Sequence, residues 1–223
     1  MARFNRIQVA QKIFDTGLMP IFYHPDLETA KSIVKACYEG GVRVMEYTNR
    51  GDFAHELYSE LNKYIAKELP EMAFGVGTIM DAPTAALFIQ LGANFIVSPA
   101  LHSDTALLCN RRKISWIPGC GSVTEISKAE ELGAEFVKVF PAQSVGGPDF
   151  VKSVKAPMPW TNFVITGGVD ATEESLKKWF DAGASCVGMG SNLITSDVLK
   201  NKDYALLQKN VESTLALIRK VKK

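Results

Sequence analysis

The chain has 223 residues, of which 47% are hydrophobic and 22% are charged, a composition that favours one ordinary globular domain. Its 25 basic and 24 acidic side chains give a formal net charge of +1, which argues against a nucleic acid or an anionic membrane as partner. The sequence has no apolar run of the roughly 18 residues that cross a bilayer, and residues 1–11 do not form a secretory signal. We therefore expect a cytoplasmic protein.

Cysteine and histidine usage argues against a metal site. The four cysteines form no C-x-x-C pair, and the three histidines (His24, His55 and His102) stand at no metal-ligand spacing. We expect free thiols in a reducing compartment, no bound metal and no cofactor.

Taken in chain order, the predicted elements begin with a helix over residues 4–16 and continue as a repeated sequence pattern. In this pattern a helix-like run ends in glycine, a residue suited to a left-handed helix C-cap, and an apolar segment follows. The pattern occurs at Gly40-Gly41-Val42, Leu91-Gly92-Ala93, Leu132-Gly133-Ala134 and Ala182-Gly183-Ala184. The apolar segments predict strands that start near residues 18, 43, 73, 94, 114, 136, 162 and 185. The steps between them leave room for one strand and one helix of ordinary length.

The stretches between the strands have helical signals. Residues 28–39 and 54–67 place apolar side chains at helical spacing, and their outer positions are charged. Asp81, Ser122 and Thr172 stand where helix N-caps are expected. A last helix is predicted over residues 204–222, with a basic end that suits the helix dipole.

Eight strand–helix units predict an α/β fold, a (β/α)₈ TIM barrel with an extra N-terminal and an extra C-terminal helix. We expect a single domain, with the N-terminal helix at 1–17, the barrel at 18–193 and a C-terminal helical extension at 194–223. An open doubly wound sheet is the alternative. It is disfavoured because the first strand runs into His24-Pro25-Asp26 rather than a G-x-G-x-x-G loop.

In a barrel, the carboxyl ends of the strands meet at one mouth. Lys138 is the most informative residue there, because strand alternation places it on the same face as Phe136 and Phe140. Burial disfavours the ammonium form, and a neutral amine can attack a ketone to form a Schiff base. A lysine that only pairs with a carboxylate is the alternative.

Two further charged residues lie on the second predicted strand. Glu46 stands among apolar residues, where a carboxylate is costly unless it is paired or takes part in chemistry. It is a candidate partner of Lys138 and a candidate general acid/base. Arg50 has the same strand parity and is expected at the mouth, as a bidentate cation for a carboxylate or phosphate. An ordinary surface arginine is the alternative.

Glycine-rich segments follow the seventh and eighth strands, at Thr166-Gly167-Gly168 and Gly188-Met189-Gly190-Ser191. Barrels often bind phosphate at this place through backbone N–H groups and a helix N-terminus. Tight turns are the alternative. Cys120, at the end of the fifth strand, is interpreted as lining the mouth, since nothing near it in sequence activates its thiol.

Four motifs together resemble the 2-keto-3-deoxy-6-phosphogluconate (KDPG)/4-hydroxy-2-oxoglutarate (KHG) aldolase family. They are Glu46-Tyr47-Thr48-Asn49-Arg50, Gly75-Val76-Gly77-Thr78, Lys138-Val139-Phe140-Pro141-Ala142 and Ile165-Thr166-Gly167-Gly168-Val169. The resemblance implies a metal-independent class I aldolase on a (β/α)₈ barrel, a homotrimer that cleaves KDPG to pyruvate and glyceraldehyde 3-phosphate. It also implies possible cleavage of KHG to pyruvate and glyoxylate, and a place in the Entner–Doudoroff pathway.

By position, the resemblance makes Lys138 the Schiff-base lysine and Glu46 the proton-transferring carboxylate. Arg50 and Thr78 would hold the pyruvyl carboxylate. The remaining substrate contacts that it implies are Pro99, Phe140, Thr166, Gly167, Gly168, Gly190 and Ser191, with the phosphate near Gly167, Gly168 and Ser191.

Two alternatives to this function remain, and a third is disfavoured. The substrate could be 2-keto-3-deoxy-6-phosphogalactonate, because Asn49-Arg50-Gly51 stands where the family often has Leu-Arg-Thr. The chain could be a non-catalytic sugar-phosphate-binding barrel, which has no need of an amine in an apolar strand. A sugar-phosphate epimerase would need metal-ligand histidines or paired aspartates at strand ends, and the sequence shows neither.

Overall fold

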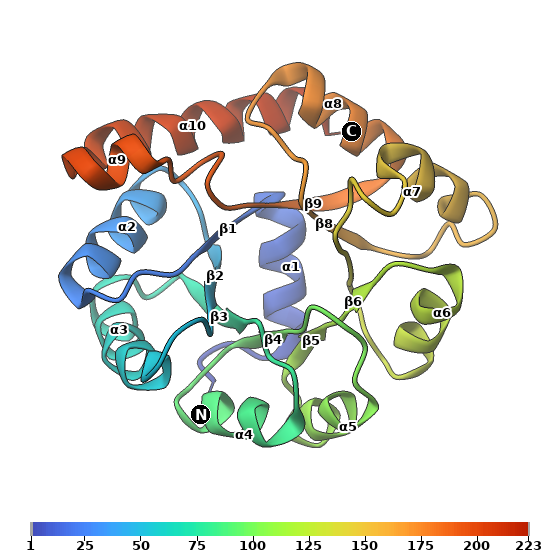
Figure 1. Cartoon of the computed structure of the whole chain (residues 1–223), viewed down its shortest axis with the longest axis horizontal. Helices are drawn as coiled ribbons and strands as arrows, with labels where there is room; N and C mark the ends of the chain where they lie inside the picture. Colours follow the sequence, from blue (N-terminus) through green and yellow to red (C-terminus); the bar gives the residue numbers. More distant parts are fainter. Residues whose placement is uncertain (1, 223) are drawn as a thin grey trace.

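The computed structural model describes residues 2–222 and shows a ring of parallel strands inside a ring of helices (Figure 1). The order of the strands in the sheet is β5-β4-β3-β2-β1-β9-β8-β7-β6. Their bounds are β1 (Leu18–Phe22), β2 (Val44–Thr48), β3 (Ala73–Gly77), β4 (Phe95–Val97), β5 (Ser115–Ile117), β6 (Gly119–Cys120), β7 (Val137–Val139), β8 (Phe163–Thr166) and β9 (Ala184–Met189).

The ring closes at Pro118, which is the single residue between β5 and β6. β5 pairs with β4 and β6 pairs with β7, so the two short strands are halves of one barrel strand. Proline has no N–H to donate to a ladder, which explains the division at this residue. The predicted (β/α)₈ barrel is therefore confirmed, and the open doubly wound sheet is excluded.

The helices are α1 (Arg6–Thr16), α2 (Leu27–Glu39), α3 (Ala54–Glu68), α4 (Ala82–Gln90), α5 (Ser103–Arg112), α6 (Val123–Glu131), α7 (Gly147–Lys155), α8 (Glu173–Ala182), α9 (Ser196–Asn201) and α10 (Tyr204–Val221). Asp81, Ser122 and Thr172 cap α4, α6 and α8 as the sequence predicts. α10 packs against both α8 and α2 and so completes the outer layer between them (Figure 1). Among the described residues, no helix combines the length and apolarity needed to cross a membrane.

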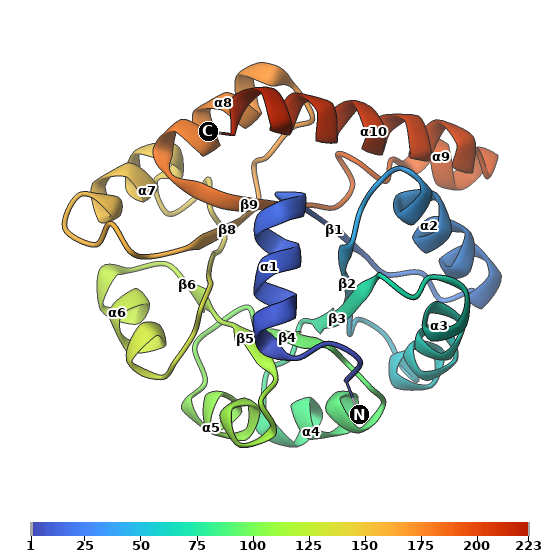
Figure 2. The ribbon, with the colours of Figure 1, turned by 180° about the vertical axis from the view of Figure 1, so that it is seen from behind.

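One end of the barrel is covered by α1, which crosses the centre of the ring in Figure 2. α1 leads through Gly17 directly into β1, so it lies at the N-terminal ends of the strands. Val9 and Ile13 of α1 are fully buried against inward-facing side chains of the strands, including Phe95 and Phe136. This apolar layer excludes water from one end of the barrel interior.

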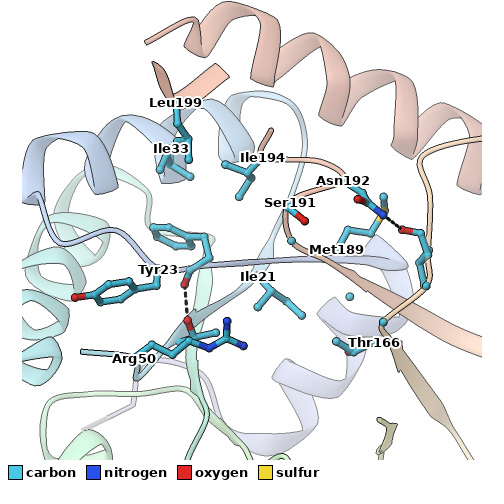
Figure 3. Close-up of a pocket in the computed structure, with 17 residues that line it drawn as sticks. Ile21, Tyr23, Ile33, Arg50, Thr166, Met189, Ser191, Asn192, Ile194 and Leu199 are labelled. Atoms are coloured by element: carbon cyan, nitrogen blue, oxygen red, sulfur yellow. Dashed lines mark hydrogen bonds between the residues drawn. The ribbon is translucent and has the colours of Figure 1, made fainter. Parts of the chain in front are cut away.

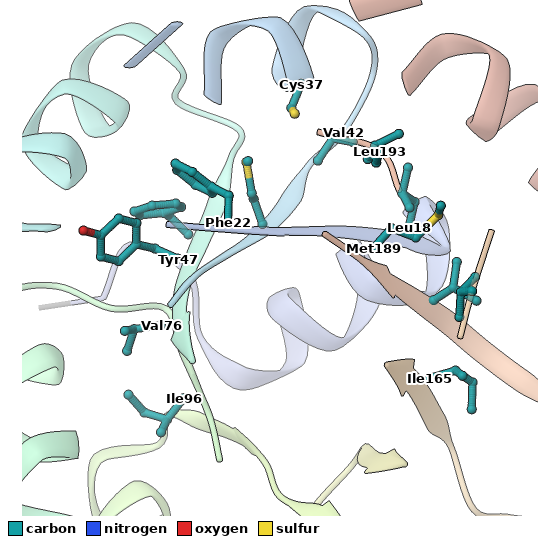
Figure 4. Packing of buried hydrophobic residues seen from close by; sticks show 14 of the residues in the cluster. Leu18, Phe22, Cys37, Val42, Tyr47, Val76, Ile96, Ile165, Met189 and Leu193 are labelled. Carbon is teal, nitrogen blue, oxygen red and sulfur yellow. The ribbon is translucent and has the colours of Figure 1, made fainter. Parts of the chain in front are cut away.

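A second apolar cluster lies between the strands and the surrounding helices (Figure 4). It contains the side chains that alternate outward, such as Leu18, Tyr47 and Val76. Cys120 is 1% exposed and belongs to this outer cluster. The expectation that it lines the mouth is wrong, because strand alternation turns Gly119 rather than Cys120 toward the interior. All four cysteines are free and buried, as the sequence indicates.

Candidate active site

Lys138 lies on β7 with its side chain directed into the barrel. Its side chain is 7% exposed, and Nζ lies 5.1 Å from the centroid of the Phe140 ring. Phe136, two residues earlier on the same face, belongs to the interior apolar cluster. The amine therefore lies beside the Phe140 ring, in a nearly dry environment.

Glu46 of β2 faces this amine across the barrel interior. Its side chain is 1% exposed, and Oε1 lies 3.8 Å from Nζ of Lys138. Burial raises the pKa of the Glu46 carboxyl, while the charges of Lys138 and Arg50 oppose that rise. Oε2 of Glu46 has no hydrogen-bond partner among the described residues. The pair thus consists of a buried amine and a buried carboxyl group, one oxygen of which lacks a hydrogen-bond partner among the described residues.

Glycines on the inward faces of neighbouring strands allow close packing around this pair. A Cβ atom at Gly77 would lie 1.7 Å from Glu46 Oε1, and one at Gly119 would lie 2.2 Å from the carbonyl oxygen of Pro99. At Gly188, a Cβ atom would lie 2.7 Å from Thr166 Oγ1. A side chain at any of these three positions would displace a neighbour, so glycine is what allows these atoms to pack so closely.

A cavity of about 530 Å³ opens at the carboxyl ends of β1, β2, β8 and β9 (Figure 3). Thr48 and Thr166 lie on the wall of this cavity. Thr48 is two residues after Glu46 on β2, and Thr166 is two residues after Val164, which pairs with Lys138. Both threonines are therefore one step closer to the mouth than the buried pair. The sequence-predicted residues that line the cavity are Arg50, Thr166, Gly167, Gly168, Gly190 and Ser191.

The loop after β8 has the backbone expected of an anion site. Gly167 and Gly168 have φ values of 96° and 79°, a left-handed region that favours glycine. Thr166 Oγ1 is buried and has no hydrogen-bond partner among residues 2–222. Successive N–H groups in such a loop form a concave donor surface for phosphate or carboxylate oxygens.

The loop after β9 supplies the other side of this surface. The Gly190 carbonyl oxygen accepts hydrogen bonds from the N–H groups of Leu193 and Ile194, both at 2.9 Å. Ser191 and Asn192 therefore occupy the first turn of a short helical segment, where N–H groups have no partner within the helix.

Asn192 joins the two loops and is absent from the sequence-based prediction. Its Nδ2 donates to the Val169 carbonyl oxygen at 2.9 Å and to Asp170 Oδ1 at 2.8 Å. The signal in the sequence is an amide residue directly after Gly190-Ser191. That signal is weak until the fold shows that the loop after β8 lies within its reach.

Thr78, Pro99 and Phe140 do not line the 530 Å³ cavity. Thr78 follows β3 and has a φ of 61°, an unusual conformation for a β-branched residue that is found disproportionately at functional sites. Pro99 follows β4, with its carbonyl oxygen against Gly119. Phe140 instead stays with the buried pair, next to the Lys138 amine.

The site thus combines a buried amine beside a carboxyl group with two loops suited to an anion. The family model for KDPG and KHG aldolase matches residues 9–210. The chain belongs to this aldolase family.

Relatives over most of the chain agree. A 2-dehydro-3-deoxy-phosphogluconate aldolase of Pseudoalteromonas atlantica is 32% identical over 87% of this chain and 88% of its own length. The KHG/KDPG aldolase of Escherichia coli is 32% identical over 90% of this chain and 92% of its own. A 2-dehydro-3-deoxy-6-phosphogalactonate aldolase of E. coli is 36% identical, but over 53% of this chain and 57% of its own.

Solved structures show the same fold. The KDPG aldolase of Zymomonas mobilis with 3-phosphoglycerate superposes with a TM-score of 0.84 at 26% identity, over 98% of this chain and 100% of that one. A KDPG aldolase of Legionella pneumophila with pyruvate captured as a covalent carbinolamine gives 0.83 at 25% identity, over 93% and 97%. The predicted family, fold class and enzyme class, a carbon–carbon lyase, are confirmed.

Proposed function

We propose that this protein is a Schiff-base aldolase that cleaves KDPG to pyruvate and glyceraldehyde 3-phosphate, with Lys138 as the nucleophile. The observation that carries the proposal is the buried Lys138 amine 3.8 Å from the buried Glu46 carboxylate. A barrel that only binds sugar phosphates has no use for this costly pair. The pyruvate carbinolamine in the Legionella relative supports the same chemistry.

The pair produces its own nucleophile. Burial raises the pKa of the Glu46 carboxyl, and transfer of one proton from the Lys138 ammonium to the Glu46 carboxylate gives a neutral amine and a neutral carboxylic acid. The amine then attacks the C2 ketone of the substrate, and a carbinolamine forms. Loss of water from the carbinolamine, with a proton supplied by Glu46, gives the iminium.

The iminium is the electron sink for cleavage. The Glu46 carboxylate takes the proton of the C4 hydroxyl, the C3–C4 bond breaks, and its electron pair moves into the iminium to give an enamine and the free aldehyde. Glu46 returns a proton to C3, and water hydrolyses the resulting iminium to pyruvate and the free amine. No oxidant or reductant is consumed.

The remaining roles follow from position. We assign the pyruvyl carboxylate to Arg50 and Thr78 at the ends of β2 and β3, because guanidinium binds carboxylates bidentately. The phosphate then lies on the N–H groups of the loops after β8 and β9, around Gly167, Gly168, Gly190 and Ser191. Pro99, Phe140 and Thr166 would contact the carbon chain between these two ends.

Trapping with borohydride tests the proposal. Incubation with pyruvate and sodium borohydride, followed by peptide mass mapping, is expected to give a reduced pyruvate adduct on Lys138. The matched control is Lys63→Met, which removes an exposed lysine of α3 and should leave the adduct intact. No adduct in the wild-type protein would exclude imine chemistry and favour the non-catalytic barrel.

A substrate panel separates the alternatives. KDPG, its galactonate isomer and KHG differ at the hydroxyl-bearing carbons or in the phosphate, so their kcat/KM values rank the three aldolase assignments directly. We expect KDPG to rank first, in line with the 32%-identical relatives that span most of the chain. Activity confined to the galactonate isomer would reverse this assignment.

We further propose that the protein is a cytoplasmic homotrimer that acts in the Entner–Doudoroff pathway. The four buried free thiols fit a reducing compartment. The trimer and the pathway rest on the family resemblance, and light scattering tests the trimer. A particle of three times the chain mass is expected, and a monomer would contradict it.

A further inference from the structure

The backbone conformation at Gly77 does not require a glycine. Gly77 is the last residue of β3, it pairs with Thr48 of β2, and it is not among the glycines with positive φ. Glycine inside a strand weakens it, because no side chain packs and more backbone entropy is lost. The reason for this residue must therefore be the space that a side chain would occupy.

That space is filled by one side chain. A Cβ atom at Gly77 would lie 1.7 Å from Oε1 of Glu46, 2.5 Å from Cδ and 2.9 Å from Cγ. These are the three atoms nearest to it, and all belong to the Glu46 side chain. The carboxylate therefore rests directly on the Gly77 backbone.

The same carboxylate oxygen also faces the lysine. Oε1, the atom that would clash with a Cβ at Gly77, is also the atom 3.8 Å from Nζ of Lys138. Oε2 has no hydrogen-bond partner among the described residues. Packing against Gly77 thus takes the place of the hydrogen bonds that orient most buried carboxylates.

We propose that Gly77 is a positioning residue, whose missing side chain sets the Glu46 carboxylate against Lys138. The inference rests on the proposed function for its catalytic consequence, but its steric part does not depend on activity. A methyl group at position 77 would push the carboxylate off its place while leaving the lysine and the anion-binding loops unchanged.

The catalytic test compares Gly77→Ala with Glu46→Gln. In Gly77→Ala we expect kcat to fall by about 100-fold or more, the range of general acid/base contributions, with KM little changed. Solvent deuterium exchange into the pyruvate methyl group, which needs the base, should fall in parallel. Adding Gly77→Ala to Glu46→Gln should lower kcat no further. A further fall in that background would assign Gly77 a merely structural role.

The matched control is Gly75→Ala on the same face of β3, where a Cβ atom would meet the Phe95 ring at 2.3 Å rather than Glu46. It should cost stability while retaining deuterium exchange. Loss of exchange in Gly75→Ala equal to that in Gly77→Ala would overturn the proposal.

A stability cycle tests the steric part even if Gly77→Ala alone fails to fold. In a Glu46→Ala background the space beside residue 77 is empty, so Gly77→Ala should leave the thermal midpoint unchanged, whereas in wild type it should lower it. An equal fall in both backgrounds would overturn the inference. Because this readout needs no substrate, it separates failure of this inference from failure of the aldolase proposal, which the borohydride adduct tests.

Discussion

Replacing Lys138 with methionine removes the cation that faces Glu46 and keeps a side chain of similar length. In the wild-type protein, burial raises the pKa of the Glu46 carboxyl, and the charge of Lys138 opposes that rise. The substitution therefore raises this pKa further and leaves a buried carboxylate without its close partner. Two unit charges about 4 Å apart interact by about 4 kcal/mol at an effective dielectric constant of about 20.

Proton linkage sets a second limit on the unfolding free energy that Lys138→Met can lose. A carboxyl group whose pKa is raised in the folded state contributes stability that is present below the unfolded pKa, about 4.3, and is lost as pH rises toward the folded pKa. In Lys138→Met, the loss of unfolding free energy cannot exceed the cost of protonating Glu46, which is about 1.4 kcal/mol for each pH unit above the unfolded pKa. The limit is about 4 kcal/mol at pH 7.5 and about 1 kcal/mol at pH 5.

Urea unfolding followed by tryptophan fluorescence measures both values. We expect Lys138→Met to lose about 4 kcal/mol of unfolding free energy at pH 7.5 and about 1 kcal/mol or less at pH 5. Adding Glu46→Gln should recover most of the loss at pH 7.5, since the uncompensated charge is gone. Equal losses at the two pH values, or no recovery in the double variant, would refute the argument that Lys138 compensates the Glu46 carboxylate.

Three further outcomes are expected. Arg50→Ala should raise KM for 2-keto acids by about tenfold to a hundredfold, because hydrogen bonds to charged groups are worth about 1.5–3 kcal/mol; an unchanged KM in steady-state assays would remove Arg50 from the carboxylate site. Ser191→Ala should raise KM for KDPG but not for KHG, which has no phosphate, and an equal rise for both would contradict a phosphate contact. Ile13→Ala, at a fully buried position of α1, should cost about 2–5 kcal/mol in urea unfolding. A cost below about 1 kcal/mol would show that α1 does not pack as a plug.

The sequence predicts the barrel well because its units repeat. The predicted strand starts at 18, 43, 73, 94, 114, 136, 162 and 185 each fall within one residue of the observed starts at Leu18, Val44, Ala73, Phe95, Ser115, Val137, Phe163 and Ala184. Each unit carries its own local signals, a C-terminal glycine and an apolar strand, so an error in one unit does not shift the next. The residues after the seventh and eighth predicted strands, which are β8 and β9 in the structure, are therefore placed at the mouth by counting alone.

Contacts between different strand–helix units could not be predicted from the sequence in this way. The Gly77–Glu46 contact depends on the parallel register of β2 and β3, in which Glu46 pairs with Gly75, and on how far the side chain extends along the strand. The bridge from Asn192 to Val169 likewise depends on how two loops converge. Neither is encoded in spacing along the chain. Cys120 is different, because it has the same strand parity as outward-facing Trp116, and strand alternation alone places it outside the barrel.

The direction of the Lys138 side chain is fixed by its neighbours on β7 more than by the amine. Outward-facing Val137 and Val139 are buried between strands and helices, while Phe136 packs in the interior cluster above α1. A slip of one residue would exchange these faces, so that the interior would lose Phe136 and the amine would enter the outer apolar layer. Both changes are costly, since an unpaired cation and a lost aromatic contact would have to be tolerated together. The apolar residues therefore specify the register, and the register holds the amine in the barrel against its own preference for water.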